Sequence, residues 1–412
     1  IDEAVRVAEA APVVLLCVGL NEIAESEGMD RSNMELSKGQ RELIEAVCKV
    51  NRNVVLVLSG GSPFVIPGSF RAAIHGYLGG QAGAGAMADA LLGKVNPSGK
   101  LNETWPLQLE DTPAYAYFPS KERTAEYREG LYIGYRYYDT ANIPVRYPFG
   151  HGLSYTTFLY SDIRAEKDRV TFTIANVGAW DGAEVAQVYV SCKDGNVFRP
   201  KKELKGFAKV FLKAGECRTV SVSLDDKAFR YFNVKTNRWE VESGIYTISV
   251  ASDAAHVRLS ANIRVEGTNA PAPYGALPGY ESGRITRISE VEYRDLLGHP
   301  IPDGHWGGEL TRNDAICQLY YAKTGAARLV YKILTHMKGK SEAKGIPDLN
   351  ILFVYNMPFR ALAKMSGGLM SDRMVDDVVL LVNGHFWRGL GRLIGDFFRN
   401  RRANKAFMRK IR

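Results

Sequence analysis

A short apolar run followed by an acidic segment stands near the start of the chain: Val13-Val-Leu-Leu-Cys-Val-Gly-Leu-Asn-Glu-Ile-Ala-Glu-Ser-Glu-Gly-Met-Asp-Arg31. Residues 13–18 are apolar and β-branched, which predicts a strand covered on both faces, as in the parallel sheets of α/β proteins. Four carboxylates follow, on Glu22, Glu25, Glu27 and Asp30. Ligands of such sheets gather beyond the carboxyl ends of the strands, so the acidic segment is a candidate site.

A helix is expected after the acidic segment. Ser37 is a preferred N-cap residue, and Gln40 three positions later completes a capping box. The apolar stripe of this helix consists of Leu43, Ile44, Val47 and Val50. The loop between strand and helix is then about 18 residues long, against about two to six in most such connections, and long ordered loops tend to be functional.

Strands and helices alternate over the first hundred residues. The pattern predicts a helix at 1–11, a strand at 13–18, a helix at 38–50, strands at 54–58 and 73–78, and a helix at 83–92. This alternation implies a parallel sheet with helical crossovers. About three strands are few for a sheet with both faces covered. We therefore expect further strands upstream of Ile1, in a protein of which this chain is a fragment or a processed product.

Glycines flank the start of the helix at 83–92, in Gly79-Gly-Gln-Ala-Gly83. Exposed amides at a helix start can hold an anion. The alternative, which we favour, is tight packing of helix against strand. Neither a P-loop nor a dinucleotide-binding glycine motif occurs in the sequence.

Residues 119–160 form an aromatic-rich segment between domains, after a partial α/β sandwich at 1–118. Tyrosines recur here, among them Tyr132, Tyr135, Tyr137 and Tyr138. Each tyrosine offers an apolar face and a polar tip, so such a cluster suits a sugar platform or the packing of one domain on another. We favour domain packing.

An alternating pattern replaces the helical one at 161–267. About seven short runs such as Val170-Thr-Phe-Thr-Ile174 and Tyr246-Thr-Ile-Ser-Val250 are separated by turn residues. This predicts an immunoglobulin-like β-sandwich. The sandwich lacks the cysteine pair of immunoglobulin domains and resembles the fibronectin type III kind.

A proline-rich linker at 268–278 leads into a mainly α-helical C-terminal extension at 279–412. Helices are predicted at 289–297, 311–336, 358–365, 371–383 and 386–410. From Arg388 onward nine Lys or Arg stand against one Asp, a net charge of +8 that equals that of the whole chain. Such a basic amphipathic helix can pack on its own domain, lie on an anionic membrane or bind nucleic acid. We favour docking, and the sequence contains no recognised nucleic-acid module.

The composition bounds the class of protein. The chain has 412 residues, of which 46% are hydrophobic, enough for two to four domains with real cores. No apolar run reaches the length of a membrane span, and no export signal is visible. The five cysteines are odd in number and widely spaced, which indicates buried thiols in a reducing compartment and a cytoplasmic protein.

Five ordered motifs resemble glycoside hydrolase family 3, which contains β-glucosidases and related exo-acting enzymes. They are the acidic loop at 21–31, Gly80-Gln-Ala-Gly83, the stretch 88–101 with Asn96-Pro-Ser-Gly-Lys100, Gly130-Leu-Tyr-Ile-Gly-Tyr-Arg-Tyr-Tyr-Asp139, and Tyr147-Pro-Phe-Gly-His-Gly-Leu-Ser-Tyr155. Each motif alone is weak evidence, but their common order makes the resemblance specific. It extends from residue 13 to about 265 and includes the β-sandwich.

The resemblance implies that Glu27, the glutamate before Gly-x-Asp-Arg, is the catalytic acid/base. In a retaining mechanism one carboxyl group protonates the leaving oxygen while a second, about 5 Å away, attacks the anomeric carbon. The carboxylate-rich loop is a plausible cause of a raised pKa at Glu27. Asp30 and Arg31 are expected to pair and shape the loop.

The second carboxyl group is not expected within this chain. In the family an Asp nucleophile comes from a barrel domain, and a (β/α)8 barrel of about 250 residues does not fit here. Ser161-Asp162 and Ser371-Asp372 superficially match the nucleophile motif but lack the following Trp. We interpret both pairs as helix or turn caps.

The expected function is that of the C-terminal portion of a retaining β-glucosidase-like hydrolase that acts on terminal β-D-glucosyl residues of glucosides or oligosaccharides. Its expected partners are this substrate and the N-terminal barrel domain, and an oligomer is compatible with the sequence. No cofactor, metal or nucleic acid is expected. The alternative is a non-catalytic interaction module that tethers to membranes through 386–412.

Overall fold

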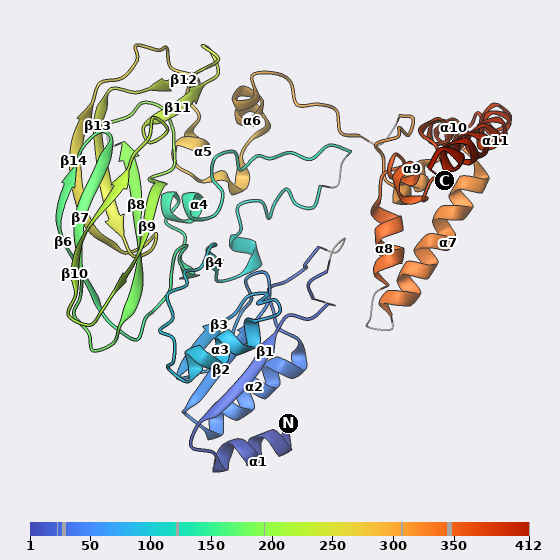
Figure 1. Cartoon of the computed structure of the whole chain (residues 1–412). Coiled ribbons are helices and arrows are strands. Elements are labelled where there is room, and N and C mark those ends of the chain that lie inside the picture. The colour runs from blue at the N-terminus through green and yellow to red at the C-terminus, as the bar shows by residue number, and fades with distance from the viewer. Residues whose placement is uncertain are drawn as a thin grey trace. The chain divides into compact units, whose positions relative to one another are not determined.

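The computed structural model describes residues 1–22, 24–26, 30–120, 123–192, 194–305, 308–343 and 348–411. The chain divides into two compact units. The first unit comprises Ile1–Gly19 and Asn33–Asp303, and the second comprises Leu20–Ser32 and Gly304–Arg412. Figure 1 shows the elements of both.

A three-stranded parallel sheet opens the first unit, as predicted. Its strands, in the order β1-β2-β3, are β1 (Val14–Gly19), β2 (Val54–Ser59) and β3 (Ala72–His75). The accompanying helices are α1 (Asp2–Ala10), α2 (Lys38–Val50) and α3 (Gly83–Leu91). Helix α2 buries Ile44 and Val47, at the 3.6-residue period that its sequence predicts.

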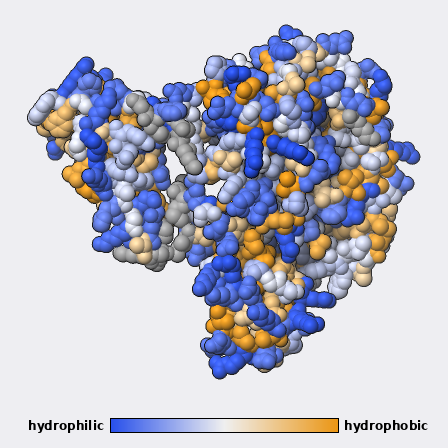
Figure 2. Space-filling view, turned by 180° about the vertical axis from the view of Figure 1, so that it is seen from behind, coloured by the Kyte–Doolittle hydropathy of each residue, from blue (hydrophilic) through white to orange (hydrophobic). Residues whose placement is uncertain are grey.

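One face of this sheet is open in the described chain. Leu15 and Cys17 of β1 are exposed, whereas Val18 and the alternate residues of β2 are buried. Leu15 and Cys17 pair with Val55 and Val57, which are only half-buried. Figure 2 shows hydrophobic residues gathered on the lower part of the molecule, where Figure 1 places the sheet and α1. The prediction that residues 13–18 are covered on both faces is therefore wrong for this chain, because nothing described packs over Leu15.

Tyrosines form a core between the sheet and the β-sandwich. Tyr132, Tyr137 and Tyr138 are buried with Tyr280 and Tyr293, and the Tyr280 hydroxyl donates to the Arg128 carbonyl at 2.9 Å. The surrounding elements are β4 (Trp105–Pro106), η1 (Leu109–Asp111), α4 (Tyr135–Thr140), β5 (Val145–Tyr147), α5 (Pro278–Glu281), η2 (Ile285–Arg287) and α6 (Glu290–Leu297). The burial of these tyrosines fits the packing role, whereas Tyr127 and Tyr155 of the same segment are exposed.

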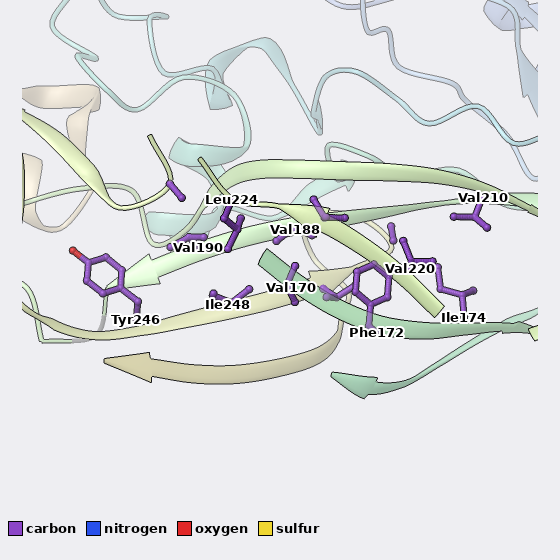
Figure 3. Packing of buried hydrophobic residues seen from close by; sticks show 14 of the residues in the cluster. Val170, Phe172, Ile174, Val188, Val190, Val210, Val220, Leu224, Tyr246 and Ile248 are labelled. Carbon is purple, nitrogen blue, oxygen red and sulfur yellow. The ribbon is translucent and has the colours of Figure 1, made fainter. Parts of the chain in front are cut away.

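Two antiparallel sheets make the β-sandwich. One has the order β10-β7-β6 and the other β14-β13-β8-β9. The strands are β6 (Phe158–Ala165), β7 (Arg169–Asn176), β8 (Gly182–Cys192), β9 (Glu203–Leu212), β10 (Cys217–Ser223), β13 (Gly244–Ala251) and β14 (Val257–Val265), with a separate hairpin of β11 (Arg230–Asn233) and β12 (Arg238–Val241). Figure 3 shows Phe172, Ile174, Val188 and Ile248 meeting between the sheets.

The Ser161-Asp162 pair lies inside β6 and is not a cap. The register of β6 on β7 shifts between Ser161 and Arg164, and Asp162 has a φ of 58°. The Ser161 hydroxyl donates to the Asp162 carboxylate at 2.5 Å. The interpretation as a cap is wrong here, because Ser-Asp also fits the irregular backbone of a β-bulge. Ser371 does cap a helix, since its hydroxyl accepts from Met374 N.

In its described part, the second unit consists of helices and contains no strand. Its elements are η3 (Ile316–Tyr321), α7 (Gly325–Glu342), α8 (Leu349–Asn356), α9 (Ala361–Met365), α10 (Asp372–Val382) and α11 (Phe386–Ile411). Their core includes Ile316, Phe359, Val375 and Val382. The predicted single helix at 311–336 is wrong, because Ala322 and Thr324 adopt extended backbone between η3 and α7.

The thiols are more accessible than the sequence predicts. All five cysteines are free; Cys17 and Cys217 are exposed and the other three are half-buried. The prediction of buried thiols is wrong, because Cys17 lies on the open face of the sheet. Within the described residues, none of the helices combines the length and the apolar character that crossing a bilayer requires.

Candidate active site

The carboxyl ends of β1 and β2 meet in unusually close contact. Gly19, the last residue of β1, pairs with Ser59, the last residue of β2. A Cβ atom on Gly19 would stand 2.0 Å from the carbonyl oxygen of Ser59. Only glycine fits at this position, and it is the residue from which the acidic segment leaves the sheet.

Helix α2 holds the start of the acidic segment. The Ser37 hydroxyl accepts from Gln40 N at 3.4 Å, as a capping box requires. The Gln40 side chain does not return to Ser37; its Oε1 accepts from Gly19 N at 3.2 Å. The predicted capping box is thus half formed, and its second half fixes the end of β1.

The C-terminal end of the acidic segment is also held near the carboxyl ends of the strands. Val65 N donates to the Met34 carbonyl at 2.7 Å, and Met34 and Leu36 are buried. Glu35 pairs with Arg41 of α2 at 3.0 Å. Residues 20–33 therefore leave and rejoin the domain at two fixed points beyond the carboxyl ends of the strands.

Within the acidic segment, the described residues form one turn. Asn21 accepts through its carbonyl from Ala24 N and Glu25 N, at 3.0 and 2.9 Å. Glu22 and Asp30 are exposed, and Glu25 is half-buried. Burial lowers the pKa of Arg31, against the attraction of the Glu25 carboxylate. The Glu25 carboxylate thus acts on Arg31, and the pairing of Asp30 with Arg31 stays a prediction.

Glu27 lies outside the described residues, together with Ile23, Gly28 and Met29. Its predicted role as acid/base and its expected raised pKa stay predictions. What the structure supplies is the position of the two anchors, Gly19 and Met34, between which the Glu27 segment runs.

An aromatic cluster that the sequence did not predict lies at the carboxyl end of β3. The His75 ring is 4.1 Å from that of Tyr77 and 5.2 Å from that of Trp105, and Trp105 is also 5.2 Å from Phe64. Phe64 and Trp105 are buried, so the cluster is a packed support without an open aromatic surface. The sequence predicts a strand at 73–78, which contains His75 and Tyr77, but not their contacts with Phe64 and Trp105.

Tyr77 connects the aromatic cluster to the carboxyl end of β2. Its φ is 50°, which is uncommon for a residue with a side chain. Its carbonyl accepts from Gly60 N at 3.3 Å and from the Ser59 hydroxyl at 3.5 Å. Burial, and then the charge of Glu103, raises the pKa of Tyr77, so its hydroxyl keeps its proton at neutral pH. The Tyr77 carbonyl is therefore bonded to the last residue of β2 and to the residue that follows it.

The glycines after β3 serve packing. A Cβ on Gly79 would lie 2.9 Å from the Cα atom of Gly83, at the start of α3. The contact shows that Gly79 packs closely on the start of α3, and packing of this helix against the strand through the glycine motif stays a prediction.

Comparisons with known proteins agree with this arrangement. Residues 1–155 match the Glycosyl hydrolase family 3 C-terminal domain, and residues 184–254 match the Fibronectin type III-like domain. Thermostable beta-glucosidase B of Acetivibrio thermocellus is 38% identical over 395 residues, which are 93% of this chain and 48% of that protein. An exo-alpha-(1->6)-L-arabinopyranosidase of Bifidobacterium longum is 42% identical over 329 residues, covering 73% of this chain and 44% of that protein.

Solved structures are similar as well. The crystal structure of a GH3 beta-glucosidase from Bifidobacterium adolescentis has a TM-score of 0.63 at 41% identity, over 71% of this chain and 43% of that one. The chain spans less than half the length of these relatives. It belongs to glycosyl hydrolase family 3, and it carries the C-terminal α/β domain and the fibronectin type III-like domain of that family.

Proposed function

We propose that this chain is the acid/base-bearing part of a retaining glycoside hydrolase that releases terminal β-D-glucosyl residues. Glu27 is the general acid/base, and an Asp of a barrel domain outside this sequence is the nucleophile. The observation that carries the proposal is the double anchoring of residues 20–33, through Gly19 and Met34, beyond the carboxyl ends of a parallel sheet. A loop that leaves and rejoins a domain at two anchored residues can present a carboxyl group to a neighbouring domain.

The chemistry requires both carboxyl groups in turn. Glu27 gives its proton to the glycosidic oxygen while the Asp attacks the anomeric carbon, which forms a covalent glycosyl-enzyme and releases the alcohol. Glu27, now a carboxylate, takes a proton from water, whose oxygen attacks the same carbon and restores both residues. General acid catalysis contributes about 10²- to 10⁴-fold, so the part that carries Glu27 is expected to have negligible activity alone.

The open face of the sheet supports the involvement of further polypeptide. Leu15 and Cys17 are exposed on a strand whose sequence is typical of a covered one. The relatives named above are about twice as long as the part that this chain matches. We infer that residues outside this sequence cover Leu15 and supply the barrel.

The names of the relatives bear on which sugar is released. Relatives at similar identity are named as beta-glucosidases and as an arabinopyranosidase. β-D-Glucose is proposed because the relative that matches 93% of the chain and the similar solved structure are both named as beta-glucosidases. Aryl β-D-glucoside and aryl α-L-arabinopyranoside, compared at equal concentration, distinguish the two substrates.

The decisive experiment uses the intact protein with Glu27→Gln. Hydrolysis of an alkyl β-glucoside is expected to fall by about 10²- to 10⁴-fold, whereas a dinitrophenyl β-glucoside, whose leaving group needs no proton, still forms the glycosyl-enzyme. Glu22→Gln and Glu25→Gln are the matched controls from the same loop and should retain activity. Unchanged turnover of the alkyl glucoside by Glu27→Gln would refute the assignment.

A further inference from the structure

The last helix of the chain has two faces of different character. One face of α11 packs on α10, beside which it lies in Figure 1. At the crossing, a Cβ on Gly389 would lie 2.9 Å from the Asp377 carbonyl oxygen. Further along this face, Arg392 pairs with Asp377 at 2.9 Å, and Asn400 donates to the Gly368 carbonyl at 2.8 Å. The inner face is thus held mainly by polar contacts.

The apolar residues of α11 are split between the two faces. Leu390 and Leu393 are half-buried on the inner side. Trp387, Ile394 and Phe398 are exposed, with Trp387 at 82%. They are seven and four residues apart, so they share one face of the helix. The expectation that α11 docks its apolar face on its own domain therefore holds only for the inner residues.

Cations continue this outer stripe toward the C-terminus. Arg401 follows Ile394 by seven residues, and Lys405 follows Phe398 by seven. Arg401, Arg402, Lys405 and Arg409 are exposed and make no ion pair with any residue that the structure describes. From Gly304 to Arg412, nineteen Lys or Arg stand against eight Asp or Glu, so the surroundings of the helix are basic as well.

We propose that the outer face of α11 binds the surface of an anionic lipid bilayer. Trp387, Ile394 and Phe398 insert among the acyl chains near the headgroups, and the following cations contact the lipid phosphates. This combination of exposed apolar side chains and cations on one helix favours a membrane over nucleic acid. Phosphates of a nucleic acid would pair with the cations but leave the apolar side chains in water.

Vesicle sedimentation of the full chain tests the proposal. The chain is expected to bind phosphatidylcholine vesicles that contain one third phosphatidylglycerol, to bind pure phosphatidylcholine weakly, and to lose affinity as salt rises. Changing Arg401, Arg402 and Lys405 together to Gln should weaken binding on the order of a hundredfold. The Trp387→Ser, Phe398→Ser double variant should weaken it at least tenfold.

Matched controls come from the β-sandwich. Phe207 and Phe211 are as exposed as Phe398, and Lys167, Lys209 and Lys213 are exposed cations. Their changes to Ser and to Gln should leave vesicle binding unaltered. Trp387→Phe should retain binding but abolish most of the blue shift in tryptophan emission that vesicles induce.

Three results would overturn the inference. The first is the absence of binding to anionic vesicles at low salt. The second is binding that the Trp387→Ser, Phe398→Ser variant leaves intact and that duplex DNA displaces, which would identify a polyanion site. The third is concentration-dependent self-association that the same double variant removes while vesicle binding is absent, which would identify a second copy of the chain as the occupant.

Discussion

Lys100 Nζ lies 2.9 Å from Oε1 of Glu184, and both side chains are nearly buried. Lys100 belongs to the Asn96-Pro-Ser-Gly-Lys100 motif and Glu184 to strand β8 of the sandwich. The Lys100 ammonium also donates to the Gly152 carbonyl at 2.8 Å. Asn96 acts beside it, since its Oδ1 accepts from Tyr155 N at 2.8 Å and its Nδ2 donates to the Asp181 carbonyl. Two motifs that resemble the family thus join the α/β domain to the sandwich.

Lys100→Met is therefore expected to destabilise the first unit by about 3–5 kcal/mol, because it leaves the Glu184 carboxylate buried without its cation. Removing both partners, as Lys100→Met with Glu184→Gln, should cost clearly less than the sum of the single changes. Urea unfolding followed by fluorescence measures all three variants. Strict additivity would show that the pair is not coupled.

The contact of Gly19 with Ser59 gives a second prediction. Gly19→Ala places a Cβ against a backbone oxygen that has no room to move, so we expect a loss of about 1–3 kcal/mol. Gly39 in helix α2 is the control, because a Cβ there meets nothing within 4 Å. Gly39→Ala should stabilise the helix by up to about 1 kcal/mol. Equal effects of the two changes on the urea midpoint would contradict the steric explanation.

Local sequence signals predicted the local structure well. Helix α2 begins and ends at the predicted residues, because Ser37 and the apolar period act within a few turns. Tyr132, Tyr137 and Tyr138 pack as expected, because large amphipathic rings suit the packing of one domain on another. The family resemblance rests on motifs of this local kind.

Properties that depend on distant partners were not predictable. The Gln40 side chain bonds Gly19, 21 residues away, in preference to its own N-cap. Cys17 is exposed although its strand has the sequence of a covered one, and the helix predicted at 311–336 is broken by extended backbone at Ala322 and Thr324, just before Gly325. For Glu27 the family pattern remains the sole guide, since the residue lies outside the described part of the chain.

Asp377 predicts an unusual pH dependence in the second unit. Its side chain is fully buried, and burial raises its pKa above the ordinary 3.8, with Arg392 opposing and Asp396 adding to the shift. A carboxyl group whose pKa is higher in the folded state binds its proton more tightly there. Its contribution to stability is therefore greatest at low pH and is lost as pH rises from about 4 through the raised pKa.

Asp377→Asn is accordingly expected to melt at a higher temperature than the unaltered chain at neutral pH, and at the same temperature near the ordinary pKa of Asp. Asp376→Asn, a neighbour on α10 that is half exposed, is the control and should change little. Melting curves by circular dichroism across this range decide the matter. A lower melting temperature for Asp377→Asn at neutral pH would mean that the Arg392 pair outweighs the cost of burial.

Asn383 gives the last prediction, because it closes the helical core with two reciprocal hydrogen bonds. Its Oδ1 accepts from Leu310 N at 2.8 Å, and its Nδ2 donates to the Leu310 carbonyl at 2.7 Å. Asn383→Asp keeps the acceptor but sets a buried carboxylate oxygen against that carbonyl, at a cost of about 1–3 kcal/mol or more. Low pH should restore part of the loss, since a protonated Asp donates again.

Limited proteolysis locates the effect of Asn383→Asp. Because Asn383 and Leu310 both belong to the second unit, cleavage should accelerate within 304–412 while a fragment that contains the β-sandwich persists. Asn404→Asp is the matched control, as its amide also donates to a carbonyl, that of Gly368, but from an exposed position. Equal acceleration by both variants, or cleavage spread over the whole chain, would show that the Asn383 bonds are not what holds Leu310 in the helical core.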